Sequence, residues 1–305
     1  MTDAERNQYL VLGATGGQGG AVARALADRG RPVRGFARRA VAEPPVPLVT
    51  GDLGDPDAVR RAFDGVTHVA VTLPLVYDPK RVTEFARTIA EAARTAGVRR
   101  LVYNTNTSLP AVTTGYAAFE TRRAAEEILR DSGVPLVVLR PPVYLENLFN
   151  PGVGGALMDQ GVLAYPLPED RPVAWLTHDD LGAAMVAALD RPELAGSTVD
   201  VGGPEVVTGP ELASIFARTL GREVRYVRLD VELFEQGLGQ ALGAEAAAGV
   251  SGIYRFAGTD AGRNLFDLDP TVLSGTFGAA PTPIARWVEA QPWHRWSTVP
   301  AGEPG

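Results

Sequence analysis

Residues 13–19 have the composition of a phosphate-binding turn. They read GATGGQG and directly follow the apolar run 9–13. Glycine lets the backbone turn tightly and lets a pyrophosphate approach the N–H groups at the start of a helix. Amphipathic spacing after the glycines predicts that helix up to Gly30. The residues expected to hold the phosphates are Gly13, Thr15, Gly16, Gly17, Gln18 and Gly19. Glycines with this spacing also occur in ordinary tight turns, so the prediction depends on the strand and helix around them.

The end of the next apolar run indicates which dinucleotide would fit. A carboxylate there would accept a hydrogen bond from the ribose 2′-hydroxyl of NAD(H) and would repel the 2′-phosphate of NADP(H). Residues 33–39 read VRGFARR and contain no acid, whereas Arg38 and Arg39 can bind phosphate oxygens through their guanidinium groups. We therefore expect NADP(H) to be preferred over NAD(H). The alternative is that the two arginines only form a solvated edge.

Residues after the later predicted strands extend the same site, because ligands of open parallel sheets bind outside the carboxyl ends of the strands. Asp52 follows the third strand and suits the adenine amino group, although turn formation alone would also explain an aspartate there. The other residues expected to line the site are Leu53, Thr72, Leu73, Pro74, Asn104 and Val143.

The elements that position these residues alternate regularly. Strands are expected at 9–13, 32–36, 48–50, 66–72, 101–104 and 136–139, with helices at 17–30, 55–64, 80–96 and 117–131 between them. Nearly continuous apolar strands separated by helices predict an α/β fold with a doubly wound parallel sheet, the Rossmann arrangement. We expect this dinucleotide-binding domain to occupy residues 1–150.

The second half of the chain is less regular. Glycines, prolines and aromatic residues are scattered through 143–172. Strands at 173–176, 198–201 and 223–227 and helices at 178–189, 210–220 and 231–248 follow. Residues 151–305 are expected to form mainly a smaller, substrate-binding cap that is partly interleaved with the first domain.

Composition excludes several classes of chemistry. The chain has 305 residues, no cysteine and three histidines, so thiol catalysis and cysteine-bound zinc are excluded and no metal site is expected. With 29 basic and 36 acidic residues the net charge is −7, which argues against direct binding of nucleic acid. No apolar run reaches the ~18 residues of a membrane span, and the first residues lack the pattern of a signal peptide. We expect a cytoplasmic monomer or homodimer that acts on a small molecule.

Several motifs together resemble the NmrA-like branch of the atypical short-chain dehydrogenases/reductases. They are LVLGATGGQGGAVARAL, VRGFARR, GDLGD, RPPVYLEN, THDDLGAAMVAAL and VGGPEVVTGPELASIFARTLGREVRY, in family order between residues 10 and 226. The resemblance implies a Rossmann domain that binds NADP(H) or NAD(H), with a cap closing over a substrate.

The resemblance also implies where catalytic residues would lie. In the superfamily a Ser, a Tyr and a Lys protonate a carbonyl as hydride arrives. Thr105 best matches the Ser, Arg122 stands at the Lys position, and Ala118 stands at the Tyr position. An arginine stays protonated and cannot relay a proton as a lysine can, so a ribose or an anion is the alternative ligand for Arg122. Solvent exposure on a helix would equally explain Arg122, and loop formation would equally explain Thr105.

Neighbouring side chains are candidates for the substrate pocket. Tyr116 and Tyr144 are candidates for proton donation or stacking, and Tyr144, Asn147 and His178 for substrate binding. Tyrosines at such positions also form pocket walls, and residues 177–180 equally fit a helix N-cap.

Three functions are compatible with this pattern. The first is reduction of a quinone, enone or aromatic ketone by NAD(P)H, because a reduced quinone needs little help from a general acid. The alternatives are a non-enzymatic NADP(H)-sensing regulator and a non-redox biosynthetic enzyme on the same fold.

Overall fold

A seven-stranded parallel sheet forms the centre of the first domain. The structure is a computed structural model that describes residues 7–297. The strand order is β3-β2-β1-β4-β5-β6-β9, and every pairing is parallel. The strands are β1 (Tyr9–Leu12), β2 (Val33–Ala37), β3 (Leu48–Thr50), β4 (His68–Thr72), β5 (Arg100–Asn104), β6 (Leu136–Arg140) and β9 (Thr198–Asp200). The predicted doubly wound Rossmann-type sheet is confirmed.

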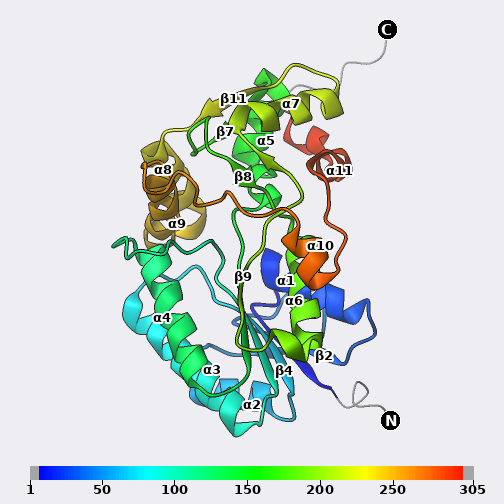
Figure 1. The fold of residues 1–305 in the computed structure, drawn as a ribbon, viewed down its shortest axis with the longest axis vertical. Helices are drawn as coiled ribbons and strands as arrows, with labels where there is room; N and C mark the ends of the chain where they lie inside the picture. Colours follow the sequence, from blue (N-terminus) through cyan, green and yellow to red (C-terminus); the bar gives the residue numbers. More distant parts are fainter. Residues whose placement is uncertain (1–6, 298–305) are drawn as a thin grey trace.

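Helices cover both faces of this sheet (Figure 1). One layer contains α1 (Gly17–Ala27) and α6 (His178–Asp190), and the other contains α2 (Pro56–Phe63), α3 (Pro79–Thr95) and α4 (Ala117–Asp131). Alternate residues of a strand point to opposite faces. In β1, Tyr9 and Val11 therefore pack on the α1/α6 side, whereas Leu10 and Leu12 pack on the α2/α3/α4 side. This double burial explains why the strand is apolar throughout.

The segments after residue 150 form a second group of elements, drawn in the upper part of Figure 1. Strand β7 pairs in parallel with β11, and β8 pairs in antiparallel with β10. Two later segments lie in the layers of the sheet domain, because β9 extends the sheet beside β6 and α6 packs on α1. The remaining elements are η2 (Leu145–Leu148), α5 (Pro151–Gln160), β7 (Val162–Tyr165), β8 (Val173–Ala174), η3 (Pro192–Leu194), β10 (Val206–Val207), α7 (Gly209–Leu220), β11 (Arg225–Arg228), α8 (Val231–Leu242), α9 (Ala244–Ala257), α10 (Val272–Phe277), α11 (Ile284–Ala290) and η4 (Trp293–Trp296).

Several elements of the second half differ from the sequence prediction, among them β7, β10, α10 and α11, which the sequence did not reveal. The single helix predicted over 231–248 is wrong, because Gly243 adopts φ 85° and separates α8 from α9. The region 143–172 contains a ten-residue helix, α5, which the sequence did not reveal. Its start fits ordinary capping, since the Asn150 side chain accepts from the N–H groups of Gly152 and Val153.

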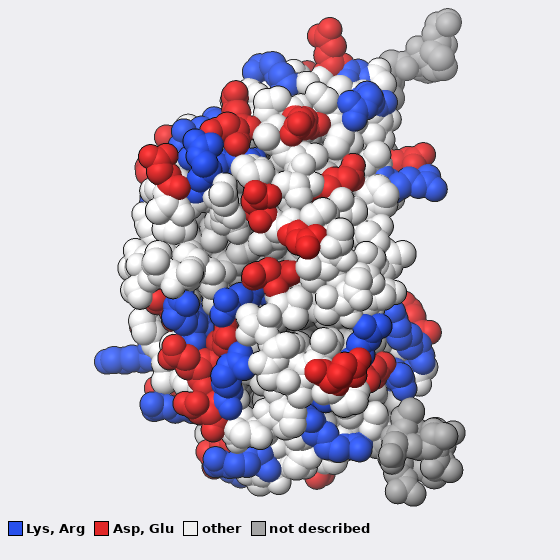
Figure 2. Space-filling view, in the orientation of Figure 1, with Lys and Arg blue, Asp and Glu red and all other residues white. Residues whose placement is uncertain are grey.

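Charged residues of both signs are interspersed over the face drawn in Figure 2. That face carries no continuous basic stripe of the kind that tracks a nucleic-acid backbone. Between residues 7 and 297, no helix combines the length and apolarity needed to cross a membrane. The same part of the chain contains no cluster of three or more His, Asp or Glu side chains that could hold a metal ion.

Candidate functional site

The glycine turn brings β1, α1 and the end of β4 into backbone contact. Gly13 has φ 77°, and a Cβ atom on it would lie 2.9 Å from the carbonyl oxygen of Thr72. A Cβ on Gly19, in the first turn of α1, would lie 2.3 Å from the carbonyl oxygen of Gly13. Real Cβ atoms do not approach other atoms so closely, so both positions need glycine. The Gly16 N–H donates to the carbonyl oxygen of Gly13 at 3.0 Å, and the N–H groups of residues 17–19 begin α1, where an anion can bind.

A cavity of about 360 Å³ lies directly above this turn, along the carboxyl ends of the strands. It is lined by twelve of the residues predicted to bind a dinucleotide: Gly13, Thr15, Gly16, Gly17, Gln18, Gly19, Arg38, Asp52, Leu53, Thr72, Leu73 and Pro74. Three predicted residues, Arg39, Asn104 and Val143, do not line it. Arg39 is exposed, whereas Asn104 and Val143 are buried.

The polar groups in this cavity fit a dinucleotide. Arg38 is exposed at the end of β2 and brings a guanidinium group to the cavity. Asp52 is also exposed, although its Oδ1 accepts from the N–H of Gly54 at 2.8 Å, as the turn-forming alternative predicts. The hydroxyl of Thr72 and the Oδ1 atom of Asn106 are buried without a hydrogen-bond partner. Both residues line the cavity, where a ligand could supply the hydrogen-bond partners that these two atoms lack.

Asn104 and Tyr144 meet at one side chain of the glycine turn. The Gln18 Oε1 atom accepts from Asn104 Nδ2 at 2.6 Å and from the Tyr144 hydroxyl at 3.1 Å. Burial raises the pKa of Tyr144 well above its usual range, so the hydroxyl keeps its proton at neutral pH. The structure thus brings these two predicted residues to the edge of the cavity through Gln18.

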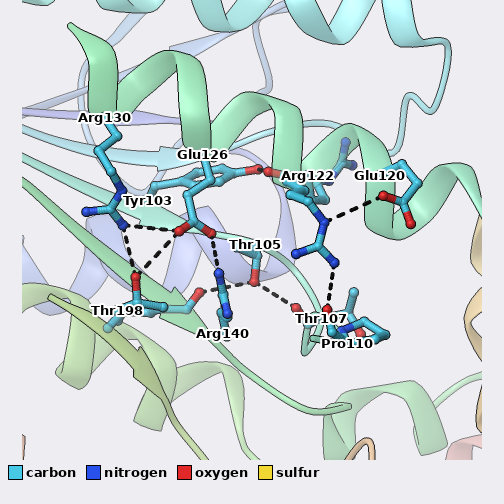
Figure 3. Close-up of polar contacts among 12 residues, drawn as sticks. Tyr103, Thr105, Thr107, Pro110, Glu120, Arg122, Glu126, Arg130, Arg140 and Thr198 are labelled. Atoms are coloured by element: carbon cyan, nitrogen blue, oxygen red, sulfur yellow. Dashed lines mark hydrogen bonds and ion pairs between the residues drawn. The ribbon is translucent and has the colours of Figure 1, made fainter. Parts of the chain in front are cut away.

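Thr105 lies one residue beyond β5 and is fully buried. Its hydroxyl donates toward the carbonyl oxygens of Thr107 at 2.7 Å and Leu139 at 3.2 Å (Figure 3). A hydroxyl has only one proton to donate, and here that proton is directed at the backbone. A catalytic role of Thr105 stays a prediction and would require this hydroxyl to rotate.

Arg122 is fully buried and faces the segment after β4. Its guanidinium group donates to the carbonyl oxygens of Pro74 at 2.8 Å and Val76 at 3.0 Å. The same group lies 4.9 Å from the centre of the Tyr77 ring, within the range of a cation–π contact. Since Pro74 and Val76 line the cavity, Arg122 supports the cavity wall in this conformation.

Glu126, one turn after Arg122, links α4 to two strands (Figure 3). One carboxylate oxygen accepts from Arg130 at 3.1 Å, and the other accepts from Arg140 of β6 at 2.8 Å. Thr198 of β9 also reaches this carboxylate. Arg140, the arginine of the RPP motif, therefore connects the sheet to α4.

Tyr116 and Asn147 lie outside the cavity lining. Tyr116 precedes α4, is half-buried, and contacts the ring of Phe256 edge-on with centroids 6.3 Å apart. Asn147 is exposed in η2 and donates to the hydroxyl of Tyr165 at 3.2 Å. Their predicted roles toward a substrate remain predictions.

His178 begins α6 and lies beside the glycine turn. A Cβ on Gly17 would be 2.7 Å from its ring, and the ring is 4.8 Å from that of Tyr144. Burial lowers the pKa of His178 to about 4, so the ring is neutral at physiological pH. Glu146 accepts from the His178 backbone N–H at 3.0 Å, and burial raises the pKa of Glu146 to about 7. Thr177 caps the helix by accepting from the N–H of Asp180, as the N-cap alternative predicts.

Eight residues that line the cavity were not among the predicted site residues: Phe36, Ala37, Gly51, Leu75, Val76, Arg81, Phe85 and Asn106. Arg81 and Phe85 come from the first turns of α3, and the Arg81 guanidinium lies 5.6 Å from the centre of the Phe85 ring. Asn106 lies just beyond β5 and has φ 68°. The sequence places Asn106 in a run of small polar residues but does not indicate its left-handed backbone.

The fold and the glycine turn define a Rossmann-type, dinucleotide-binding class of protein. The chain belongs to the NmrA-like family, whose model matches residues 5–274, as the sequence motifs indicated.

Several relatives are named as reductases. The chain is 39% identical over 234 residues to a (4-alkanoyl-5-oxo-2,5-dihydrofuran-3-yl)methyl phosphate reductase of Streptomyces griseus, which covers 73% of this chain and 77% of the relative. It is 29% identical over 272 residues to an NAD(P)H azoreductase of Xenophilus azovorans, and the match covers 86% of this chain and 92% of the azoreductase. The chain superposes on the solved structure of a triphenylmethane reductase of Citrobacter sp. complexed with NADP(H) with a TM-score of 0.75 at 23% identity. The superposition covers 92% of this chain and 99% of the reductase.

Proposed function

We propose that this protein is an NAD(P)H-dependent reductase of a conjugated carbonyl compound, such as a quinone, an enone or an aromatic ketone. The observation that carries the proposal is the cavity that starts at the glycine turn and continues along the strand ends to Asn106. Its length along the sheet suits a ligand that crosses from β2 to β5, as a dinucleotide does. The named activities of the relatives support the same reaction class.

Within this cavity, we infer that the N–H groups of residues 17–19 hold the pyrophosphate against the start of α1. Arg38 would bind the 2′-phosphate and so favour NADP(H) over NAD(H), and Asp52 would face the adenine. The apolar side chains of Phe36, Leu53 and Phe85 supply walls for the base.

The bound cofactor would supply a hydride, and the chain would supply its orientation. Tyr144 and Thr105 direct their hydroxyl protons to Gln18 and to backbone carbonyls, respectively. The raised pKa of Tyr144 makes it a poor acid. These contacts favour a substrate that needs no proton from the protein. Quinones and enones meet this condition because their reduced oxyanions are delocalised and take a proton from water.

An acceptor of the enone type is also consistent with the Streptomyces griseus relative. The name of its substrate describes a ring carbonyl conjugated with a ring double bond, together with an alkanoyl group. The named acceptors differ, since one relative reduces a dihydrofuran compound and another is an azoreductase. We therefore infer that the family shares the reductant rather than the substrate.

The proposal is tested by following NADPH oxidation at 340 nm with a panel of quinones, cyclic enones and aromatic ketones. We expect turnover with at least one conjugated acceptor and a higher kcat/KM with NADPH than with NADH. Tight NADPH binding without oxidation by any acceptor would contradict the proposal and would favour a cofactor-sensing role.

A further inference from the structure

Asn106 combines three properties that a structural loop residue does not need together. It has φ 68°, the one left-handed backbone conformation found outside glycine in residues 7–297. It lines the cavity, and its Oδ1 atom is buried without a partner. A strained backbone and an unsatisfied polar atom are each costly, and they concentrate at functional sites.

The contacts of Asn106 define what kind of ligand it would bind. Its backbone N–H donates to Asn104 Oδ1 at 2.9 Å, and its Nδ2 donates to the carbonyl oxygen of Leu73 at 3.3 Å. A carbonyl can only accept, so the amide nitrogen must face Leu73 and the oxygen must be the free atom. The missing partner is therefore a hydrogen-bond donor.

The position of Asn106 along the sheet indicates which part of a dinucleotide carries that donor. Arg38 and Asp52 lie at the ends of β2 and β3, whereas Asn106 lies past β5, on the far side of the glycine turn. If the adenosine half lies over β2 and β3, the half that reaches β5 is the nicotinamide riboside. Its donors are the ribose hydroxyls and the carboxamide N–H groups.

We infer that Asn106 is a positioning residue that accepts a hydrogen bond from the nicotinamide riboside half of the cofactor. The inference rests on the proposed function and adds to it a residue for orienting the reacting ring. It also explains how the ring is oriented in a chain without the usual Tyr and Lys, since Arg122 is engaged with Pro74 and Val76.

The test compares three ligands that share the adenosine half. NADPH contains both kinds of donor, 2′-phospho-ADP-ribose keeps the ribose but lacks the base, and 2′,5′-ADP lacks both. The variant Asn106→Gly removes the carboxamide while glycine tolerates the left-handed backbone. Asn264→Gly is the matched control, because Asn264 is exposed and remote from the cavity lining.

By isothermal titration calorimetry, we expect Asn106→Gly to bind NADPH about tenfold more weakly and 2′,5′-ADP unchanged. An equal loss for 2′-phospho-ADP-ribose would identify a ribose hydroxyl as the donor, and a loss confined to NADPH would identify the carboxamide. Unchanged affinity for all three ligands, or the same loss for all three, would overturn the inference. If the unaltered protein fails to bind NADPH, the proposed function fails first, so the two failures are distinguishable.

Discussion

Replacing Gly19 with alanine tests whether backbone contact at the glycine turn creates the cofactor site. The new Cβ would lie 2.3 Å from the carbonyl oxygen and 2.7 Å from the carbonyl carbon of Gly13. Ordinary contacts begin near 3.4 Å, so α1 or the turn must move by about 1 Å. Overpacking of this kind costs about 1–3 kcal/mol, partly offset by up to about 1 kcal/mol from the better helix propensity of alanine.

The displaced atoms belong to the turn that would hold the pyrophosphate. We therefore expect Gly19→Ala to weaken NADPH binding at least tenfold, a change of about 1.4 kcal/mol, while the protein still folds. Fluorescence titration of NADPH and thermal unfolding measure the two effects separately. Gly239→Ala is the control, because a Cβ there meets no atom within 4 Å, and it should leave NADPH affinity unchanged. Wild-type NADPH affinity in Gly19→Ala would refute the reasoning.

Three further substitutions test other parts of the site. Arg38→Ala should weaken NADPH binding about tenfold or more in a fluorescence titration and leave NADH binding unaffected; an unchanged NADPH affinity would show that Arg38 is only a solvated edge. Arg122→Met should lower the free energy of unfolding in urea by about 2–4 kcal/mol, because the carbonyls of Pro74 and Val76 lose their donors; an unchanged midpoint would contradict this support. Glu146→Gln removes a carboxyl that favours folding only while protonated, since burial raises its pKa from 4.5 to about 7. Relative to the unaltered protein, the variant should gain stability as pH rises from about 4.5 to 7, by about 3 kcal/mol at most. If the difference in the free energy of unfolding between the two proteins does not change with pH, the raised pKa of Glu146 is excluded.

Features determined by local sequence were predictable. Asp55 caps α2 with Pro56 in its first turn, and β1 is apolar because both of its faces are buried. The glycine turn was predictable for the same reason, because its geometry is set by neighbouring residues. Helix α5 was not, since its internal glycines lower helix propensity. Gly154 is needed because Trp296, far along the chain, occupies the space of its side chain.

The part of the site near β5 and α4 depends on contacts that sequence spacing does not encode. The position of Arg122 in α4 was predictable, but its bonds to Pro74 and Val76 link segments that are distant in sequence. The left-handed backbone of Asn106 is likewise fixed by its contacts with Asn104 and Leu73. Such tertiary contacts override local preference, and they concentrate at functional sites.

The most direct test of the central claim is transfer of an isotopic label. NADPH carrying deuterium on one face of C4, or on the other, is incubated with the protein and an enone or aromatic ketone, because these acceptors keep the transferred hydride in a C–H bond that does not exchange with water. The product is analysed by mass spectrometry. A reductase predicts that the product gains one deuterium, beyond an enzyme-free control, from one of the two labelled forms and none from the other. Product without label from either form, or no product at all across the acceptor panel, would contradict hydride transfer at this site.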